Sequence, residues 1–392
     1  MTGALYLAWR SALASWGRNA LIAVALGVAA GLPIAAGSAL QGVQAALHAR
    51  AESTPLVAGP KGSPLDLVLR ATEFTAVGGA LPTLPARDFA PLESGALVMP
   101  MVLGAHARGV PIVGSTVEYM QWRGLRAEQG RLGAMLGECV AGTGAALRLG
   151  IGTQPGADSL TTSPDQVYSV AGSYPVRLRV VGVLAPTGTA DDDVVHVSNE
   201  TAWVIAGLGH GHQRLGADAP VDQLLRKDAA NVTASAAVRE FIEVTPENAQ
   251  RFHFHGDAAD FPVHAAIVVP RTSRDAALLL GRAESTAIQV VRPAEVIDGL
   301  FARVFRVRDL LSVVFLVVVG AALLLAGTQL ALLVRLRAPQ MQLLRRVGAS
   351  QAFIVGMVAF ELALVVAAAV GVAGTMVWFA PILQPLLRSS VA

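Results

Sequence analysis

The chain has 392 residues, of which 53% are hydrophobic and only 15% are charged, and its formal net charge is +2. This composition is too apolar for an ordinary soluble protein and too varied for one embedded in a membrane throughout, so it predicts a mixed architecture. The small net charge gives no support to nucleic-acid binding, which typically requires a strongly basic surface.

The lysines and the cysteine exclude two kinds of site. Lysine occurs only at Lys61 and Lys227, followed by Gly62 and Asp228, whereas a phosphate-binding P-loop needs Gly-Lys followed by Ser or Thr. A standard Walker A site is therefore excluded. The single cysteine, Cys139, excludes an internal disulfide and a multi-cysteine metal site, and we expect it to be a small buried apolar side chain.

The first long apolar run occupies residues 19–42, within a stretch from Arg18 to His48 that has no ionisable side chain between its ends. It exceeds the roughly 20 apolar residues that a helix needs to cross a bilayer. A cleaved signal peptide is the alternative, because Arg10 and Arg18 precede the run. Since a signal core has about 7–15 residues, the length favours a membrane span.

Two further runs are long enough to span, namely 310–334, which carries no charge, and 351–379, whose only charge is Glu361. The segment between them, 335–350, contains four arginines and no acid. The positive-inside rule therefore places this segment and residues 1–18 on the cytoplasmic side of a bacterial inner membrane. The three transmembrane helices would be surrounded by lipid.

This orientation leaves residues 43–292 outside the cytoplasm, with a composition rich in Gly and Pro and with short β-type runs at 176–184 and 287–291. The fold class expected is a membrane protein with three transmembrane helices and a large extracytoplasmic α+β domain between the first and second. Within this domain, 152–166 is predicted to be a loop and 221–244 a local helical excursion.

Residues 293–309 are predicted to form a stalk helix. Pro293 suits a helix start, and apolar residues follow at helical spacing. These apolar residues are Val296, Leu300, Val304 and Val307. We expect the helix to run without a break into 310–334. It could transmit movement between the outer domain and the membrane, or merely anchor the domain; the pattern favours neither.

The arginine-rich segment 335–350 predicts a short amphipathic helix that begins near Pro339 at the inner face of the membrane. Its apolar side comprises Met341, Leu344 and Val347, and its polar side comprises Gln340, Gln342, Arg345 and Arg346. Gly348 suits a left-handed helix terminus, and Ser350 suits the cap of the next helix. The prediction is thus helix, tight corner, helix.

This segment resembles the coupling helix of FtsX/MacB-type ABC transporter permeases, because R-x-R at Arg335 and Arg337 precedes an apolar and basic helix that ends in Val-Gly-Ala-Ser. The stretches 53–69, 137–152 and 174–189 are similar to parts of the same family, and so is the order of one N-terminal span, a large outer domain and clustered C-terminal spans.

The resemblance implies a non-enzymatic permease subunit with a MacB-like periplasmic core domain. ATP and Mg²⁺ would bind to a cognate ATP-binding subunit on another polypeptide, and a second permease copy would complete a homodimer. The outer domain would act on a periplasmic partner or cargo, for example in lipoprotein or peptide export or in zinc handling. By the same resemblance, the residues that dock on the ATPase are Arg337, Met341, Leu344, Arg345, Val347 and Gly348.

The chain departs from the family pattern at several positions. Gln340 stands where the family usually has Glu, and Pro339 replaces a good helix former. Most relatives have four spans, whereas residues 380–392 are too few to cross a bilayer, so we expect this tail to lie outside the cytoplasm. For the intramembrane Glu361, structural pairing with a polar neighbour is favoured over proton transfer.

A metal site is a further hypothesis. Strand alternation puts His253 and His255 on one face, and Asp257 and His264 are close enough in sequence to add ligands for zinc. His210 with His212, and the stretch 191–196, are further candidates that nothing in the sequence brings together. The alternative is that these are hydrogen-bonded histidines at strand ends and a solvated acidic loop.

Two other classes of function follow from these observations. A membrane-anchored metal-binding or sensor module would make the region around His253 and His255 central. A membrane-tethered hydrolase would need a catalytic motif, and the sequence contains neither Gly-x-Ser-x-Gly nor His-Glu-x-x-His.

Overall fold

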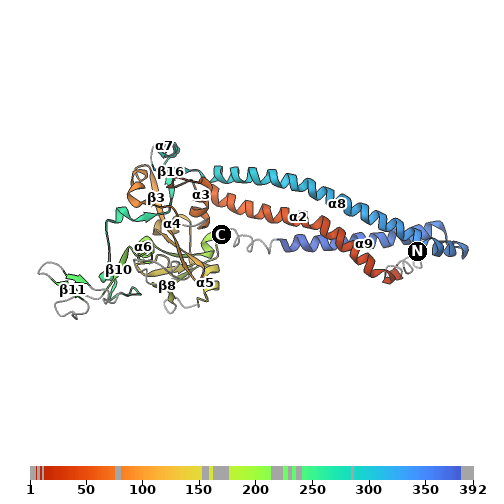
Figure 1. Cartoon of the computed structure of the whole chain (residues 1–392), viewed down its shortest axis with the longest axis horizontal. Helices are drawn as coiled ribbons and strands as arrows, with labels where there is room; N and C mark the ends of the chain where they lie inside the picture. Colours follow the sequence, from red (N-terminus) through yellow and green to blue (C-terminus); the bar gives the residue numbers. More distant parts are fainter. Residues whose placement is uncertain are drawn as a thin grey trace. The chain divides into compact units, whose positions relative to one another are not determined.

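The computed structural model describes residues 6, 9–10, 13–75, 81–151, 159–161, 176–212, 224–227, 232–234, 241–283 and 287–380. The chain divides into two compact units. One unit comprises Met1–Leu47 and Gly299–Val391 and contains the long helices, and the other comprises His48–Asp298 and contains the sheets (Figure 1). The predicted tail, 380–392, lies outside the described residues except for its first residue.

A large mixed sheet forms the centre of the His48–Asp298 unit. In spatial order its strands are β16 (Ile288–Val291), β1 (Leu56–Pro60), β15 (Ala265–Pro270), β3 (Ala96–Ala107), β4 (Val110–Ser115), β9 (Val195–Ser198), β6 (Glu138–Ala141), β8 (Arg177–Leu184) and β5 (Ala127–Gly130), with β7 (Ser159–Thr161) also paired to β8. The pairs β4–β9 and β6–β8 are parallel, and the other pairs are antiparallel. The runs predicted as strands at 176–184 and 287–291 become β8 and β16.

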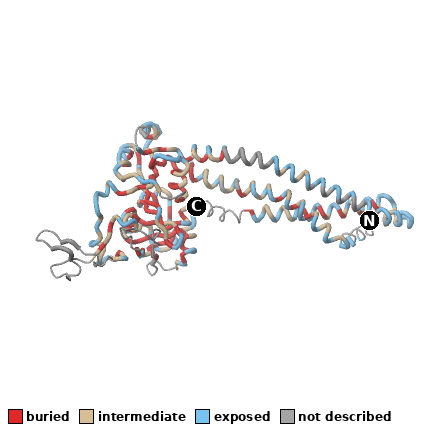
Figure 2. Tube along the Cα trace, viewed as in Figure 1, coloured by how far each residue is buried: buried red, intermediate tan, exposed pale blue. Residues whose placement is uncertain are grey.

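Short helices and small sheets surround this large sheet. The helices are α3 (Pro64–Glu73), α4 (Val117–Trp122), α5 (Thr143–Leu149), α6 (Asn199–Ile205) and α7 (Ser273–Ala283). The small sheets pair β10 (Gly209–Gly211) with β13 (Phe252–Phe254), β11 (Leu224–Lys227) with β12 (Val232–Ala234), and β14 (Pro262–Val263) with β2 (Leu84–Pro85). Strand β1 is buried along its whole length, as its continuous apolar sequence favours. Figure 2 shows that most buried residues lie in the unit that contains the sheets. The prediction of an α+β domain is confirmed.

Three long helices make up most of the other unit: α2 (Trp16–Glu52), α8 (Pro293–Arg346) and α9 (Gln351–Phe379). Among the described residues, α2 and α9 are long and apolar enough to cross a membrane. Three spans are predicted, and two such helices are found among the described residues. The third predicted span, 310–334, lies within α8, and the side chains of part of it are outside the described residues.

Three local predictions are wrong. The segment 152–166 is predicted to be a loop, but its described part is the strand β7, which pairs with β8. The segment 221–244 was expected to be helical, but its described part contains the antiparallel pair β11–β12. Asp228 and Asn231, which are turn-forming residue types, separate the two strands in the sequence and disfavour a helix there. The segment 335–350 was expected to start a separate helix near Pro339, but α8 continues through this proline as far as Arg346.

Candidate functional site

The predicted coupling segment is the C-terminal end of α8. The N–H of Ala349 donates to the carbonyl of Leu344 at 2.9 Å, and the N–H of Gly348 donates to that of Arg345 at 3.0 Å. Together with the φ of +96° at Gly348, these bonds form a Schellman motif. Glycine adopts such a positive φ readily because it has no Cβ. The predicted left-handed terminus is therefore present at the end of α8.

The next helix starts directly after this corner. The Oγ of Ser350 accepts a hydrogen bond from the backbone N–H of Phe353 at 3.2 Å, as expected of an N-cap. In the corner, Val347 is exposed over 80% of its surface, Arg345 and Gly348 are exposed, and Leu344 is half-buried. The segment thus presents apolar and basic side chains to the outside together.

Glu361, the one acid of the third predicted span, is buried against the start of α2. Its Oε1 accepts hydrogen bonds from the side chains of Asn19 at 3.0 Å and Ser15 at 3.1 Å, and it lies 3.5 Å from the Arg18 guanidinium. Such groups satisfy a carboxylate in an apolar setting, which supports the structural role.

Close contact between α2 and α9 continues along both helices. A Cβ at Gly27 would lie 2.6 Å from the Cβ of Val372, and one at Gly31 would lie 2.8 Å from the Cα of Ala373. Small residues permit such approach of two helices in a membrane. From Glu361 onward, the contacts advance toward the C-terminal end of both helices, so α2 and α9 run parallel.

At its other end, the last turn of α2 belongs to a buried polar network of the His48–Asp298 unit. The Arg50 guanidinium lies 2.7 Å from Asp191 Oδ2, and it donates to the hydroxyl of Tyr119 at 3.1 Å and to the carbonyl of Thr72 at 3.2 Å. The Tyr119 hydroxyl in turn donates to Asp191 Oδ1 at 2.6 Å. His196 Nε2 lies 3.5 Å from the same oxygen. We call these residues the Arg50 network.

Burial and charge act in opposite directions in the Arg50 network. Burial raises the pKa of Asp191, but the charge of Arg50, the neighbouring His196 and hydrogen bonds from Tyr119 and Arg50 outweigh it and lower that pKa to about 2. Burial lowers the pKa of His196 and raises that of Tyr119. The network therefore holds one ion pair and neutral partners at neutral pH.

A second arginine fastens the same end of α2. The guanidinium of Arg123, just after α4, donates to Thr54 Oγ1 at 2.7 Å and to Ser53 Oγ at 3.0 Å. His48, one turn earlier in α2, lies 2.9 Å from Asp298 in the first turns of α8. The His48–Asp298 unit thus holds the end of α2 through several polar contacts, and within this unit α2 contacts the start of α8.

The histidines form a different group from the predicted one. One ring nitrogen from each of His210, His212 and His253 lies within 4.8 Å of the others. The ring of His255 is centred 4.8 Å from that of His210 and 5.0 Å from that of His253. The pairing of β10 with β13 brings together the two stretches that the sequence left apart.

Two residues of the predicted metal set have other contacts. Asp257 accepts a hydrogen bond from the N–H of Ala259 at 2.9 Å and caps a short 3-10 helix. His264 Nδ1 accepts from the N–H of Leu103 at 3.1 Å, and burial together with the charge of Arg70 lowers its pKa to about 4. These bonds hold both residues in local structure rather than in the histidine group.

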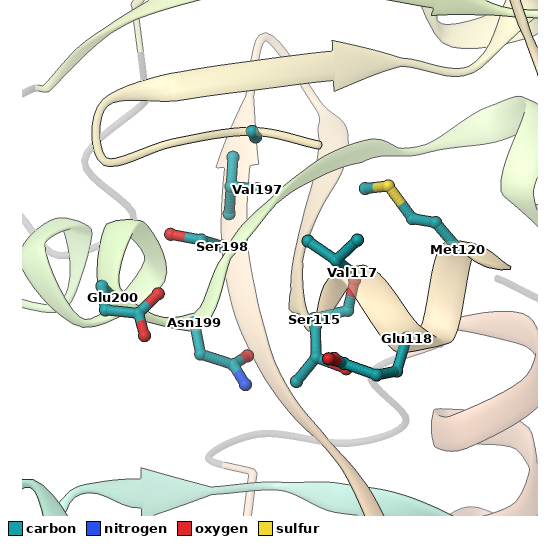
Figure 3. A pocket seen from close by; sticks show the side chains of 10 residues that line it. Ser115, Val117, Glu118, Met120, Val197, Ser198, Asn199 and Glu200 are labelled. Carbon is teal, nitrogen blue, oxygen red and sulfur yellow. The ribbon is translucent and has the colours of Figure 1, made fainter. Parts of the chain in front are cut away.

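A cavity of about 320 Å³ lies where the parallel strands β4 and β9 end. Figure 3 shows Ser115 and Asn199 at these strand ends, with Glu118 and Glu200 in the helices that follow. Its lining residues include no histidine, cysteine or lysine, so they supply no activated nucleophile of the Ser-His or Cys-His type.

No family model and no curated protein matches the sequence. Among solved structures, the chain is similar to the periplasmic region of MacB from Actinobacillus actinomycetemcomitans, with 11% identity over 64% of this chain and 94% of that one and a TM-score of 0.35. It is also similar to the extracellular domain of the noncanonic ABC-type transporter YknZ from Gram-positive bacteria, with 14% identity over 60% of this chain and 98% of that one and a TM-score of 0.32. The matched region of the first neighbour is periplasmic, and that of the second is extracellular.

Proposed function

We propose that this chain is the membrane-spanning subunit of an FtsX/MacB-type ABC transporter, in which ATP hydrolysis on a separate subunit moves the extracytoplasmic domain. The observation that carries the proposal is the single helix α8, which has 54 residues and joins the outer domain to the basic corner at Gly348. At 1.5 Å per residue it is about 80 Å long, much longer than the roughly 30 Å hydrocarbon core of a bilayer.

The two ends of α8 suit a transmitting role. Its first residue, Pro293, follows two residues after β16, so a shift of the helix acts directly on the edge of the large sheet. Its last turn carries Arg345, and the exposed Val347 follows directly after it; both would contact the ATP-binding subunit. Because a continuous helix has no flexible loop along its length, displacement of one end is passed to the other.

The helix α2 would serve as the second connection. It is anchored to α9 by Glu361 and to the outer domain by the Arg50 network. The parallel contact of α2 with α9, and the reversal of direction between α8 and α9 at Gly348, bring the starts of α2 and α9 to the end where α8 stops. This arrangement supports an orientation in which the arginines near residue 18 and those at 345–346 share the cytoplasmic side of an inner membrane.

Capture of a partner tests the proposal. We expect the chain, solubilised in a mild detergent, to co-purify with a separate ATP-binding subunit, and a homodimeric permease to be present in the complex. Leu344→Asp and Val347→Asp should release that subunit, because each adds a charge to the apolar docking surface. Leu147→Asp is the matched control, since Leu147 is a leucine of the outer domain exposed over 80% of its surface.

Two results would contradict the proposal. One is that no ATP-binding subunit is captured in any of several mild detergents. The other is that Leu344→Asp and Val347→Asp retain the subunit as well as Leu147→Asp does.

A further inference from the structure

The strands β10 and β13 have strictly alternating sequences, Gly-His-Gly-His over 209–212 and Phe-His-Phe-His over 252–255. They pair antiparallel with His210 directly opposite His253. Because side chains alternate between the two faces of a strand, all four histidines share one face. The four are His210, His212, His253 and His255, and we call them the histidine face.

The opposite face of the same strands packs against the rest of the domain. Phe252 and Phe254 pack against the core cluster that includes residues of β8 and β9. A Cβ at Gly209 or Gly211 would lie 2.6 Å from the ring of Phe254 or Phe252, respectively. The glycines therefore leave room for the phenyl rings. An isolated two-stranded sheet is marginally stable by itself, and this packing holds the histidine face in position.

The imidazoles of the histidine face lie close together. Ring centroids are 4.8 Å apart for His210 and His253, 5.0 Å for His212 and His253, and 5.6 Å for His210 and His212. His253 and His255 are exposed and the other two are half-buried, so an ion from solution can reach them.

The geometry is near that of a metal site. A tetrahedral zinc ion with bonds of about 2.0–2.1 Å holds its nitrogen ligands about 3.3 Å apart, and ring nitrogens of His210, His212 and His253 already lie within 4.8 Å of one another. Small rotations of the rings would close the difference. His253 Nδ1 lies 3.3 Å from the carbonyl of Arg251, which would fix its Nδ1–H tautomer and leave Nε2 for the metal.

We propose that the histidine face binds a late first-row divalent metal ion of the Zn²⁺ type, with His210, His212 and His253 as ligands and His255 as the fourth. Neutral imidazole is a good ligand for zinc, copper and nickel, whereas calcium and magnesium prefer oxygen ligands. The bound ion would join β10 to β13 and so link parts of the chain that are about 40 residues apart in the sequence. This inference goes beyond the transporter proposal and does not depend on it.

Calorimetric titration of the full chain with Zn²⁺ tests this site. The chain is purified in detergent without a polyhistidine tag and without any ATP-binding subunit. We expect one ion per chain with micromolar or tighter affinity, and an affinity more than about tenfold weaker in His210→Gln and in His253→Gln. His106→Gln is the matched control, because His106 lies on β3 and outside the histidine face, and it should bind as the wild type does.

A second measurement separates loss of a ligand from loss of folding. Thermal unfolding without metal should be similar in the wild type and in His253→Gln, and Zn²⁺ should raise the melting temperature of the wild type alone. Absence of saturable Zn²⁺ binding would overturn the proposal, and so would unchanged affinity in both His210→Gln and His253→Gln. Neither result bears on capture of an ATP-binding subunit, so the two proposals fail separately.

Discussion

The guanidinium of Arg50 lies 2.7 Å from the carboxylate of Asp191, and the two side chains are exposed over only 7% and 0% of their surfaces. Arg50 lies in the last turn of α2, and Asp191 lies in a short helical turn before β9. A buried ion pair contributes little net stability compared with apolar side chains, but loss of one partner leaves an uncompensated charge. The pair therefore holds the last turn of α2 against the turn that precedes β9.

Replacement of Arg50 by Met tests this role of the Arg50 network. We expect Arg50→Met to lower the free energy of unfolding of the outer domain by about 3–5 kcal/mol, because Asp191 keeps a buried charge without its partner. Urea unfolding of the chain in detergent, followed by tryptophan fluorescence, measures the change. Arg148→Met is the control, since it removes an exposed pair with Asp193 and should cost less than about 1 kcal/mol. Equal effects of the two substitutions would contradict a structural role for the network.

Acidification should destabilise the outer domain through His264. Its folded-state pKa is lowered to about 4 from the ordinary value of 6.5, so between these pH values the unfolded chain binds more protons than the folded one. Stability should therefore fall as the pH is lowered from about 6.5 to about 4, by about 3 kcal/mol from this residue. The midpoint of urea unfolding should therefore change less with pH in His264→Asn than in the wild type. If the substitution leaves the slope of the midpoint against pH unchanged, groups other than His264 cause the acid sensitivity.

Contact between α2 and α9 should be sensitive to side-chain size at Gly27. We expect Gly27→Leu to lower the melting temperature in detergent, because its side chain would overlap Val372 and Ala369, and overpacking typically costs about 1–3 kcal/mol. Gly37→Leu is a matched control on the same helix, since nothing lies within 4 Å of a Cβ there. If both substitutions have the same effect, α2 and α9 do not pack through Gly27.

Two substitutions of Glu361 distinguish structural pairing from proton transfer. Glu361→Gln keeps a carbonyl oxygen that can accept from Asn19 and Ser15, whereas Glu361→Ala leaves these half-buried groups without it. If the role is structural, Glu361→Gln should retain most of the melting temperature and of the ATP hydrolysis rate of the complex, and Glu361→Ala should lose both. If the glutamine variant folds normally but hydrolyses ATP as slowly as the alanine variant, proton transfer is favoured instead.

Local features of the chain could be predicted well where one short stretch determines them. The corner at Gly348, the cap at Ser350 and the unbroken helix through residues 293–334 depend on neighbouring residues alone. Pro339 misled the prediction of a separate coupling helix: an internal proline removes one backbone hydrogen bond and disfavours a helix, but α8 continues through it to Arg346.

Features that depend on distant residues were missed. The Arg50 network joins residues 50, 119 and 191, and no spacing in the sequence reveals that Asp191 is buried rather than part of a solvated acidic loop. The alternation of 209–212 matches that of 252–255, and this similarity was the available signal for their pairing. His264 was included with the wrong group because closeness in sequence does not show that its ring bonds to Leu103.

Crosslinking from residue 347 in intact membranes tests the central claim most directly. The single cysteine, Cys139, is buried and can be replaced by alanine, which leaves Val347→Cys as the only attachment point for a photoreactive maleimide. We expect a covalent adduct between this chain and an ATP-binding subunit, and none from Leu147→Cys in the outer domain. An adduct with that subunit from position 147, or none from position 347 while the label is fully incorporated, would contradict the assignment of this corner as the coupling element.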